Sequence, residues 1–171
     1  IQFHVATLSA DMAGGKVPPF SGMTMSVCQL RPESRGHIRI RSTDPFEPPE
    51  MQPNYLSAER DRRTAVAGMK AARAIAASAA MRPFIAREVE PGPDAADDEA
   101  LLEFCRNHGA TIFHPSGTCA MGRDPAAGAV VDPRLRVHGI EGLRVVDCSA
   151  MPTLVSGNTN APAVMMAEKA V

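Results

Sequence analysis

Residues 57–80 carry the strongest helical pattern in the chain, and proline limits it on both sides. Val66 and Met69 fall on one face, with alanines at the same helical spacing. This is the pattern of a helix that packs one side against a core. Ser57 is a favourable N-cap, and Pro83 marks where the pattern ends. We therefore expect one long helix over residues 57–80 as the main element of the fold.

Two shorter helices are expected nearer the C-terminus. One begins with the three acidic residues from Asp97 to Glu99 and stops at Gly109, which favours a helix end. The other covers residues 161–171, where Pro162 is acceptable because it lies in the first turn.

The remaining pattern is that of short strands. Residues 23–30 and 37–42 are predicted strands, the second half-buried because apolar and polar residues alternate, and the turn at 32–36 predicts an antiparallel hairpin. Residues 143–146 are a predicted short buried strand. Four prolines between residues 45 and 53 exclude regular structure there. We expect an α+β fold, with a mixed, largely antiparallel sheet packed with helices.

Composition argues against several classes of partner. The chain has 18 basic and 19 acidic residues, so it offers no excess positive charge for nucleic acid. No apolar run is long enough to span a bilayer. The histidines and cysteines lack metal-ligand spacing, and no disulfide framework is expected. Free, buried thiols suit a reducing compartment, which favours a cytoplasmic location. The four cysteines are Cys28, Cys105, Cys119 and Cys148.

His114 is the first candidate for chemistry. It lies beside Pro115, on a turn that Gly117 also shapes. A histidine changes its charge near neutral pH and can serve as the base for a substrate hydroxyl group. The alternative is a histidine with a purely structural role, which would be the commoner case for this residue considered alone.

Asn160 is the second candidate. Its amide can hold a substrate oxygen without competing as a base. Alternatively it caps the last helix, although Asn158 or Thr159 could do so instead. The first amides of that helix carry partial positive charge that would stabilise an electron-rich cofactor edge. In the alternative interpretation this is an ordinary terminal helix that packs Val164 and its methionine neighbours into a core. Asp147 could likewise meet a cofactor or simply cap a turn.

The joint pattern resembles the C-terminal region of the glucose–methanol–choline (GMC) family of flavin-dependent alcohol oxidoreductases. Residues 114–118 and 156–162, with 130–140 and 143–152 between them, carry most of this resemblance, and residues 30–36 extend it. The resemblance implies FAD as cofactor and oxidation of an alcohol, expected to be primary, to an aldehyde by hydride transfer to flavin N5. His114 would be the base and Asn160 its partner, as in the choline dehydrogenase-like subgroup. The implied flavin-lining residues are Asp147, Cys148, Asn158, Thr159, Ala161 and Pro162.

The resemblance also implies that two portions of the chain have different roles. Residues 1–112 would be a substrate-domain portion, and residues 113–171 an active-site and flavin-facing portion. No Gly-x-Gly-x-x-Gly motif is present, so most of the FAD-binding domain would lie upstream of this chain. We expect the fragment alone to be inactive and to expose apolar surface that promotes self-association.

Two other functions remain open at this point. One is a non-enzymatic binding module that kept the fold without the cofactor, although such a module has no need of the pair formed by His114 and Asn160. The other is a hydrolase that uses Ser116, which lacks the Gly-x-Ser-x-Gly turn that such enzymes need.

Overall fold

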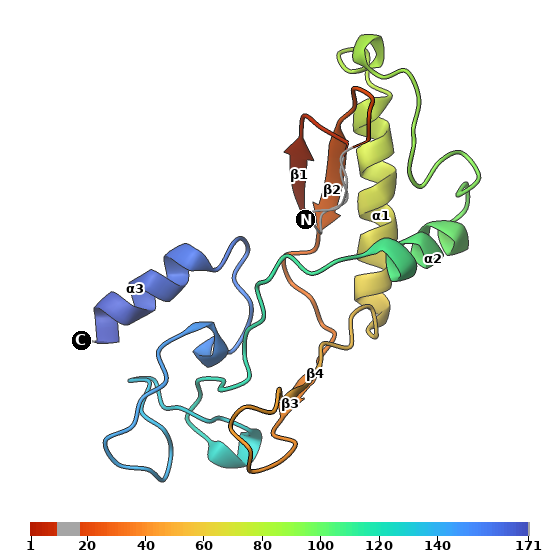
Figure 1. Ribbon diagram of the computed structural model, residues 1–171. Coiled ribbons are helices and arrows are strands. Elements are labelled where there is room, and N and C mark those ends of the chain that lie inside the picture. The colour runs from red at the N-terminus through yellow and green to blue at the C-terminus, as the bar shows by residue number, and fades with distance from the viewer. Residues whose placement is uncertain (10–17, 171) are drawn as a thin grey trace. The chain divides into compact units, whose positions relative to one another are not determined.

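A computed structural model describes residues 1–9 and 18–170, and the chain forms two compact units (Figure 1). Unit 1 comprises residues 1–34 and 55–111, and unit 2 comprises residues 35–54 and 112–171. The chain therefore leaves unit 1 after Ser34, completes a hairpin in unit 2 and returns at Tyr55.

Unit 1 is built around the long helix that the sequence predicts. Strands β1 (Gln2–Ala6) and β2 (Thr24–Cys28) pair antiparallel. Helix α1 (Glu59–Ala76) contacts β2 and also α2 (Asp98–His108), as Figure 1 shows. The buried apolar side chains between these elements belong to Val66, Ala95, Leu101 and Leu102. The apolar stripe of α1 therefore does contribute to a core.

The ends of α1 differ from the predicted ends, whereas the ends of α2 match them. Ala58, rather than Ser57, precedes α1 and offers no side-chain cap, and the helix ends at Ala76 because the chain then turns. The prediction of Ser57 as the cap was therefore wrong. For α2, the Asp97 carboxylate accepts from the Ala100 amide at 2.8 Å, and Gly109 ends the helix as expected.

Gly68 allows α1 to lie directly against β2. A Cβ atom built at Gly68 would lie 2.6 Å from the nearer methyl carbon of Val27, well inside van der Waals contact. Valine has little rotamer freedom, so its methyl groups cannot move aside without shifting the strand. The close approach of the helix and the sheet thus depends on this glycine.

We expect Gly68→Val to lower the free energy of unfolding of unit 1 by about 2 kcal/mol, because the added methyl groups overpack this contact. Ala67→Val is the matched control, because Ala67 is exposed on the same helix and should lose only about 0.5 kcal/mol of helix propensity. Urea denaturation of the two variants measures the difference. Equal losses would show that the helix and strand do not pack closely at Gly68.

Asp61 fixes the loop before the crossing to unit 2. Its side chain is buried, with 2% of its surface exposed. The carboxylate accepts hydrogen bonds from the Gln29 amide at 2.9 Å and from the backbone N–H of Glu33 at 2.9 Å. It also accepts from the Ser34 N–H at 2.7 Å and from the Ser34 hydroxyl. Burial by itself raises the pKa of Asp61, but these donors outweigh it and leave the pKa below its ordinary value.

The strand pairing differs from the predicted hairpin. Strand β2 falls within the expected range 23–30, but its partner is β1 and not residues 37–42. Residues 37–42 instead contribute β3 (His37–Arg39), which pairs with β4 (Glu50–Gln52) in unit 2. Both of these short strands are exposed along their length, so the half-buried strand was also a wrong prediction.

Strand β4 shows why proline did not prevent pairing. It lies between Pro49 and Pro53, which flank the three paired residues and do not interrupt them. A proline at the end of a strand costs no ladder hydrogen bond. The prediction that residues 45–53 contain no regular structure was therefore wrong for these three residues.

The rest of unit 2 is mostly irregular chain around a small core. Val131, Leu135 and Ala150 are buried there, and Val145 packs against them. The short strand predicted at residues 143–146 is absent among the described residues of this segment. Arg144 makes one isolated bridge with Arg136, and Leu143 is 47% exposed.

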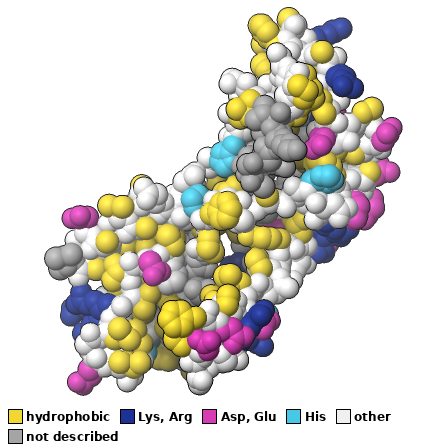
Figure 2. Space-filling view, in the orientation of Figure 1, with side chains coloured by type: hydrophobic (Ala, Val, Ile, Leu, Met, Phe, Trp, Pro, Cys, Tyr) yellow, Lys and Arg dark blue, Asp and Glu magenta, His cyan; other side chains and the backbone are white. Residues whose placement is uncertain are grey.

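Helix α3 (Asn160–Ala170) ends the described chain, one residue before the predicted end at Val171, which lies outside the described residues. Ala170 packs against the core of unit 2. Val164 and Met165 are each 54% exposed, so the interpretation in which they fill a core was wrong. Figure 2 shows hydrophobic side chains exposed over both parts of the chain.

The α+β fold class is confirmed: in the part of the chain that the structure describes, helices accompany two small antiparallel sheets of two strands each. Among the described residues, no helix has both the length and the apolar character needed to cross a bilayer.

Candidate active site

His114 is held by the irregular chain of unit 2. The segment that follows it runs alongside residues 148–150 and is bonded to them through the backbone. Gly117 N–H donates to the Cys148 carbonyl at 3.2 Å, and Cys119 N–H donates to the Ser149 carbonyl at 2.9 Å. Gly117 has φ of +86°, a conformation that glycine adopts without strain. These bonds fix the turn on which the half-buried His114 ring is carried.

Both nitrogens of the His114 ring have partners from the segment before α3. The side-chain nitrogen Nδ2 of Asn158 lies 3.0 Å from Nε2 of the ring. The hydroxyl oxygen Oγ1 of Thr159 lies 2.8 Å from Nδ1. Residues separated by more than forty positions in the sequence thus meet around one imidazole.

These contacts indicate which ring nitrogen is the acceptor. The Nδ2 group of Asn158 can only donate, so Nε2 of the neutral His114 ring accepts and carries the lone pair. Asn158 is exposed, whereas Thr159 is buried with 5% of its surface exposed. The accepting nitrogen therefore lies beside the exposed one of the two partners of the ring.

Asn160 has a different position from the one that its predicted role suggests. It is the first residue of α3 and is exposed. Among the described residues, the hydrogen bonds of the His114 ring go to Asn158 and Thr159. The sequence contains two asparagines two positions apart, and spacing alone could not decide which of them meets the histidine.

The other residues expected near a flavin lie close to the same segment of chain. The Asp147 carboxylate accepts from the Ser149 N–H at 2.7 Å and so caps the 3₁₀ turn Cys148–Ala150. The Cys148 thiol contacts the Thr159 carbonyl at 3.9 Å. Ala161 and Pro162 form the first turn of α3. The structure thus joins the turn after Asp147 to the start of α3 through Cys148 and Thr159.

The cysteines are free and half-buried, where fully buried thiols were expected. Burial raises the pKa of the Cys28 and Cys105 thiols, which therefore stay protonated at neutral pH. Across residues 1–9 and 18–170, no group of three or more His, Cys, Asp or Glu side chains is placed to hold a metal ion.

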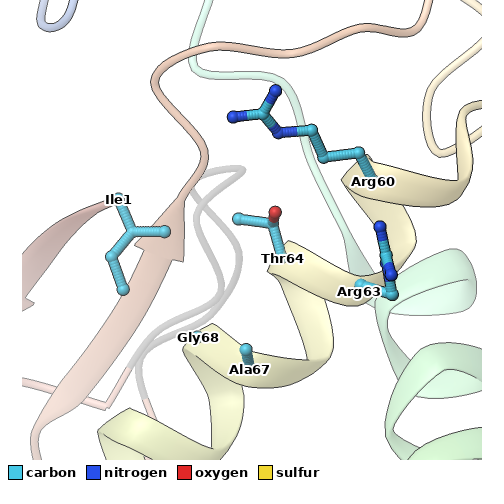
Figure 3. Close-up of a pocket in the computed structure, with 6 residues that line it drawn as sticks. All are labelled: Ile1, Arg60, Arg63, Thr64, Ala67 and Gly68. Carbon is cyan, nitrogen blue, oxygen red and sulfur yellow. The ribbon is translucent and has the colours of Figure 1, made fainter.

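A separate hollow lies in unit 1, along one side of α1 (Figure 3). It has a volume of about 340 Å³ and is lined by Arg60, Arg63 and their small neighbours Ala67 and Gly68. Arg60 is already paired with Glu33 at 2.8 Å. None of the residues that the sequence indicates for catalysis or cofactor binding lines this hollow.

The sequence matches a known protein family and proteins whose activities are named. A family profile described as GMC oxidoreductase matches residues 32–167. The chain is 45% identical over 170 residues to an alcohol dehydrogenase [acceptor] from Pseudomonas putida. It is 43% identical over 171 residues to an oxygen-dependent choline dehydrogenase from Staphylococcus xylosus. Each match covers 99% of this chain and 30% of the relative, so the chain spans less than a third of their length.

A solved structure agrees with these matches. The fold is similar to that of pyridoxine 4-oxidase from Mesorbium loti, with a TM-score of 0.86 and 28% sequence identity. That match covers 98% of this chain and 33% of the other.

Proposed function

Because the chain belongs to the GMC oxidoreductase family, we propose that it forms the active-site part of an FAD-dependent oxidoreductase acting on CH–OH groups. The observation that carries the proposal is the His114 ring, held with a lone pair at Nε2 beside the exposed Asn158. The names of the two relatives, an alcohol dehydrogenase and a choline dehydrogenase, support an alcohol as the substrate.

His114 takes the hydroxyl proton of the alcohol on Nε2. A substrate hydroxyl that donates to Nε2 replaces the Asn158 amide there, and that amide then donates to the substrate oxygen. Once Nε2 is protonated, it becomes a donor, and the carbonyl oxygen of the Asn158 side chain is the matching acceptor. Removal of the proton prepares the carbon to release hydride, which gives an aldehyde from a primary alcohol.

The residues present fit a flavin. The first amides of α3 have no partner within the helix, and the helix dipole adds partial positive charge at that end. Small side chains lie on both sides of the start of α3, and a Cβ atom built at Gly157 would meet nothing within 4 Å. FAD bound there would supply the hydride acceptor. Asp147, Cys148, Asn158, Thr159, Ala161 and Pro162 remain our proposed lining, with Asn158 shared between the flavin side and the substrate.

Most of the FAD would be bound by a part of the protein that this chain does not contain. Residues 1–112 would then form part of the substrate domain, while residues 113–171 face the flavin. The exposed apolar side chains of α3, Val164 and Met165, are consistent with contact to such a part. On this proposal the 171-residue chain alone has no turnover and tends to self-associate.

Separate substitution of Asn158 and Asn160 tests which of the two side-chain amides assists His114. We expect Asn158→Ala to lower kcat about 100-fold in the flavin-loaded protein that carries this sequence, because it removes a donor aimed at the reacting oxygen. Asn160→Ala is the matched control and should lower kcat by less than about threefold, since Asn160 makes no contact with the ring among the described residues.

The measurement is steady-state turnover of a primary alcohol, with flavin content checked by visible absorption. A larger loss from Asn160→Ala than from Asn158→Ala would restore the pairing expected from the sequence. Undiminished turnover in both variants would contradict the amide role altogether.

A further inference from the structure

Thr159 holds the His114 ring from the buried side, opposite the exposed Asn158. Its hydroxyl oxygen lies 2.8 Å from Nδ1 of the ring, and its side chain is buried. The backbone of Thr159 is also held, because its carbonyl accepts from the Ala163 N–H at 3.0 Å and contacts the Cys148 thiol. A β-branched side chain on such a fixed backbone has little freedom to turn away.

The proton on the ring follows from the two contacts taken together. A neutral imidazole carries one N–H and one lone pair. Because Nε2 accepts from the Asn158 amide, Nδ1 carries the proton and donates to the Thr159 hydroxyl oxygen. The opposite tautomer would place an N–H of the ring against the N–H of Asn158 and would lose that bond.

We infer that Thr159 is a positioning residue for His114, whose buried hydroxyl accepts from the Nδ1–H and so fixes the plane of the ring with Nε2 toward the substrate. The inference rests on the proposed function, in which Nε2 receives the substrate proton. Asn158 alone cannot hold the ring in this plane, because it is exposed and the substrate hydroxyl replaces it at Nε2. The Thr159 hydroxyl is buried and remains in place when substrate displaces Asn158.

A purely structural role for Thr159 makes a different prediction. Thr159 immediately precedes α3, where threonine is a favoured cap. Loss of a cap lowers stability but does not by itself slow proton transfer in the molecules that remain folded. The kcat of the folded protein therefore separates the two roles, whereas stability does not.

The test is nuclear magnetic resonance of the protein that carries this sequence, labelled with 15N at its histidines. Nitrogen shifts distinguish an N–H from a lone pair, and the His114 signals are those lost in His114→Gln. In the unchanged protein at alkaline pH, we expect the neutral ring to carry its proton on Nδ1. In Thr159→Val, which removes the hydroxyl but keeps the shape, we expect the Nδ1 shift to change, because the N–H loses its acceptor. Thr159→Ser, which keeps the hydroxyl, should restore the original pattern.

Steady-state kinetics then connect the contact between Thr159 and the ring to turnover. We expect Thr159→Val to lower kcat about tenfold with little change in KM, as loss of an orienting partner does, and Thr159→Ser to recover most of it. A proton on Nε2 in the unchanged protein, or an unaltered Nδ1 shift or an unaltered kcat in Thr159→Val, would overturn the inference, even if Thr159→Val is less stable. If the Nδ1 shift changes as expected while His114→Gln keeps full turnover, the proposed function fails and the positioning contact stands.

Discussion

Replacement of His114 by alanine is expected to lower kcat about 10³-fold in the flavin-loaded protein, because it removes the proposed base. Flavin binding should change little, since the backbone bonds of the following segment to residues 148–150 do not involve the ring. Steady-state turnover of a primary alcohol measures the first effect. The visible absorption of the desalted protein measures the second.

His138→Ala is the control for this experiment. His138 lies in the same unit, and its Nε2 is 3.0 Å from the Gly122 carbonyl. Its ring is bonded to a backbone carbonyl rather than placed at the proposed base, so its replacement should leave kcat within about twofold. Full turnover in His114→Ala with flavin retained would exclude His114 as the base.

The second large effect concerns stability. Asp61→Ala is expected to lower the free energy of unfolding of unit 1 by about 3 kcal/mol, because it removes the buried acceptor of the hydrogen bonds from Gln29, Glu33 and Ser34. Denaturation by urea, followed by circular dichroism, gives the loss. Asp94→Ala is the matched control, since Asp94 is an exposed carboxylate of the same unit and should change stability by less than about 0.5 kcal/mol.

The Asp61 carboxylate also makes the stability of unit 1 depend on pH. The pKa of Asp61 in the folded protein lies below its ordinary value of 3.8. The unfolded chain therefore binds this proton more readily, so the contribution is complete above pH 4 or so and is lost as pH falls through the folded pKa. Stability measured between pH 6 and pH 3 should fall less steeply in Asp61→Ala than in the unchanged protein. Parallel profiles would contradict the role of Asp61.

Local patterns in the sequence predicted those elements whose stability is decided locally. The stripe of Val66 and Met69 required one buried helix face, and Asp97 and Gly109 specified the ends of α2 through capping. These features depend on residues within one or two turns of each other, which is why a single sequence reveals them. The motif around His114 likewise indicated the family and its chemistry.

Pairing between distant segments was decided only by the tertiary structure. Strand β2 could pair with any exposed edge, and its alternation did not identify β1 as the partner. The role of Asp61 depends on residues about thirty positions away, and no local pattern marks it.

The active site shows the same division. The resemblance to the GMC family predicted that the histidine turn and the Asn-Thr-Asn segment belong to one site. Only the fold decided that the ring meets Asn158 and Thr159. Residues in the turn before a helix point in different directions, so a shift of two positions changes the partner while the composition of the motif stays the same.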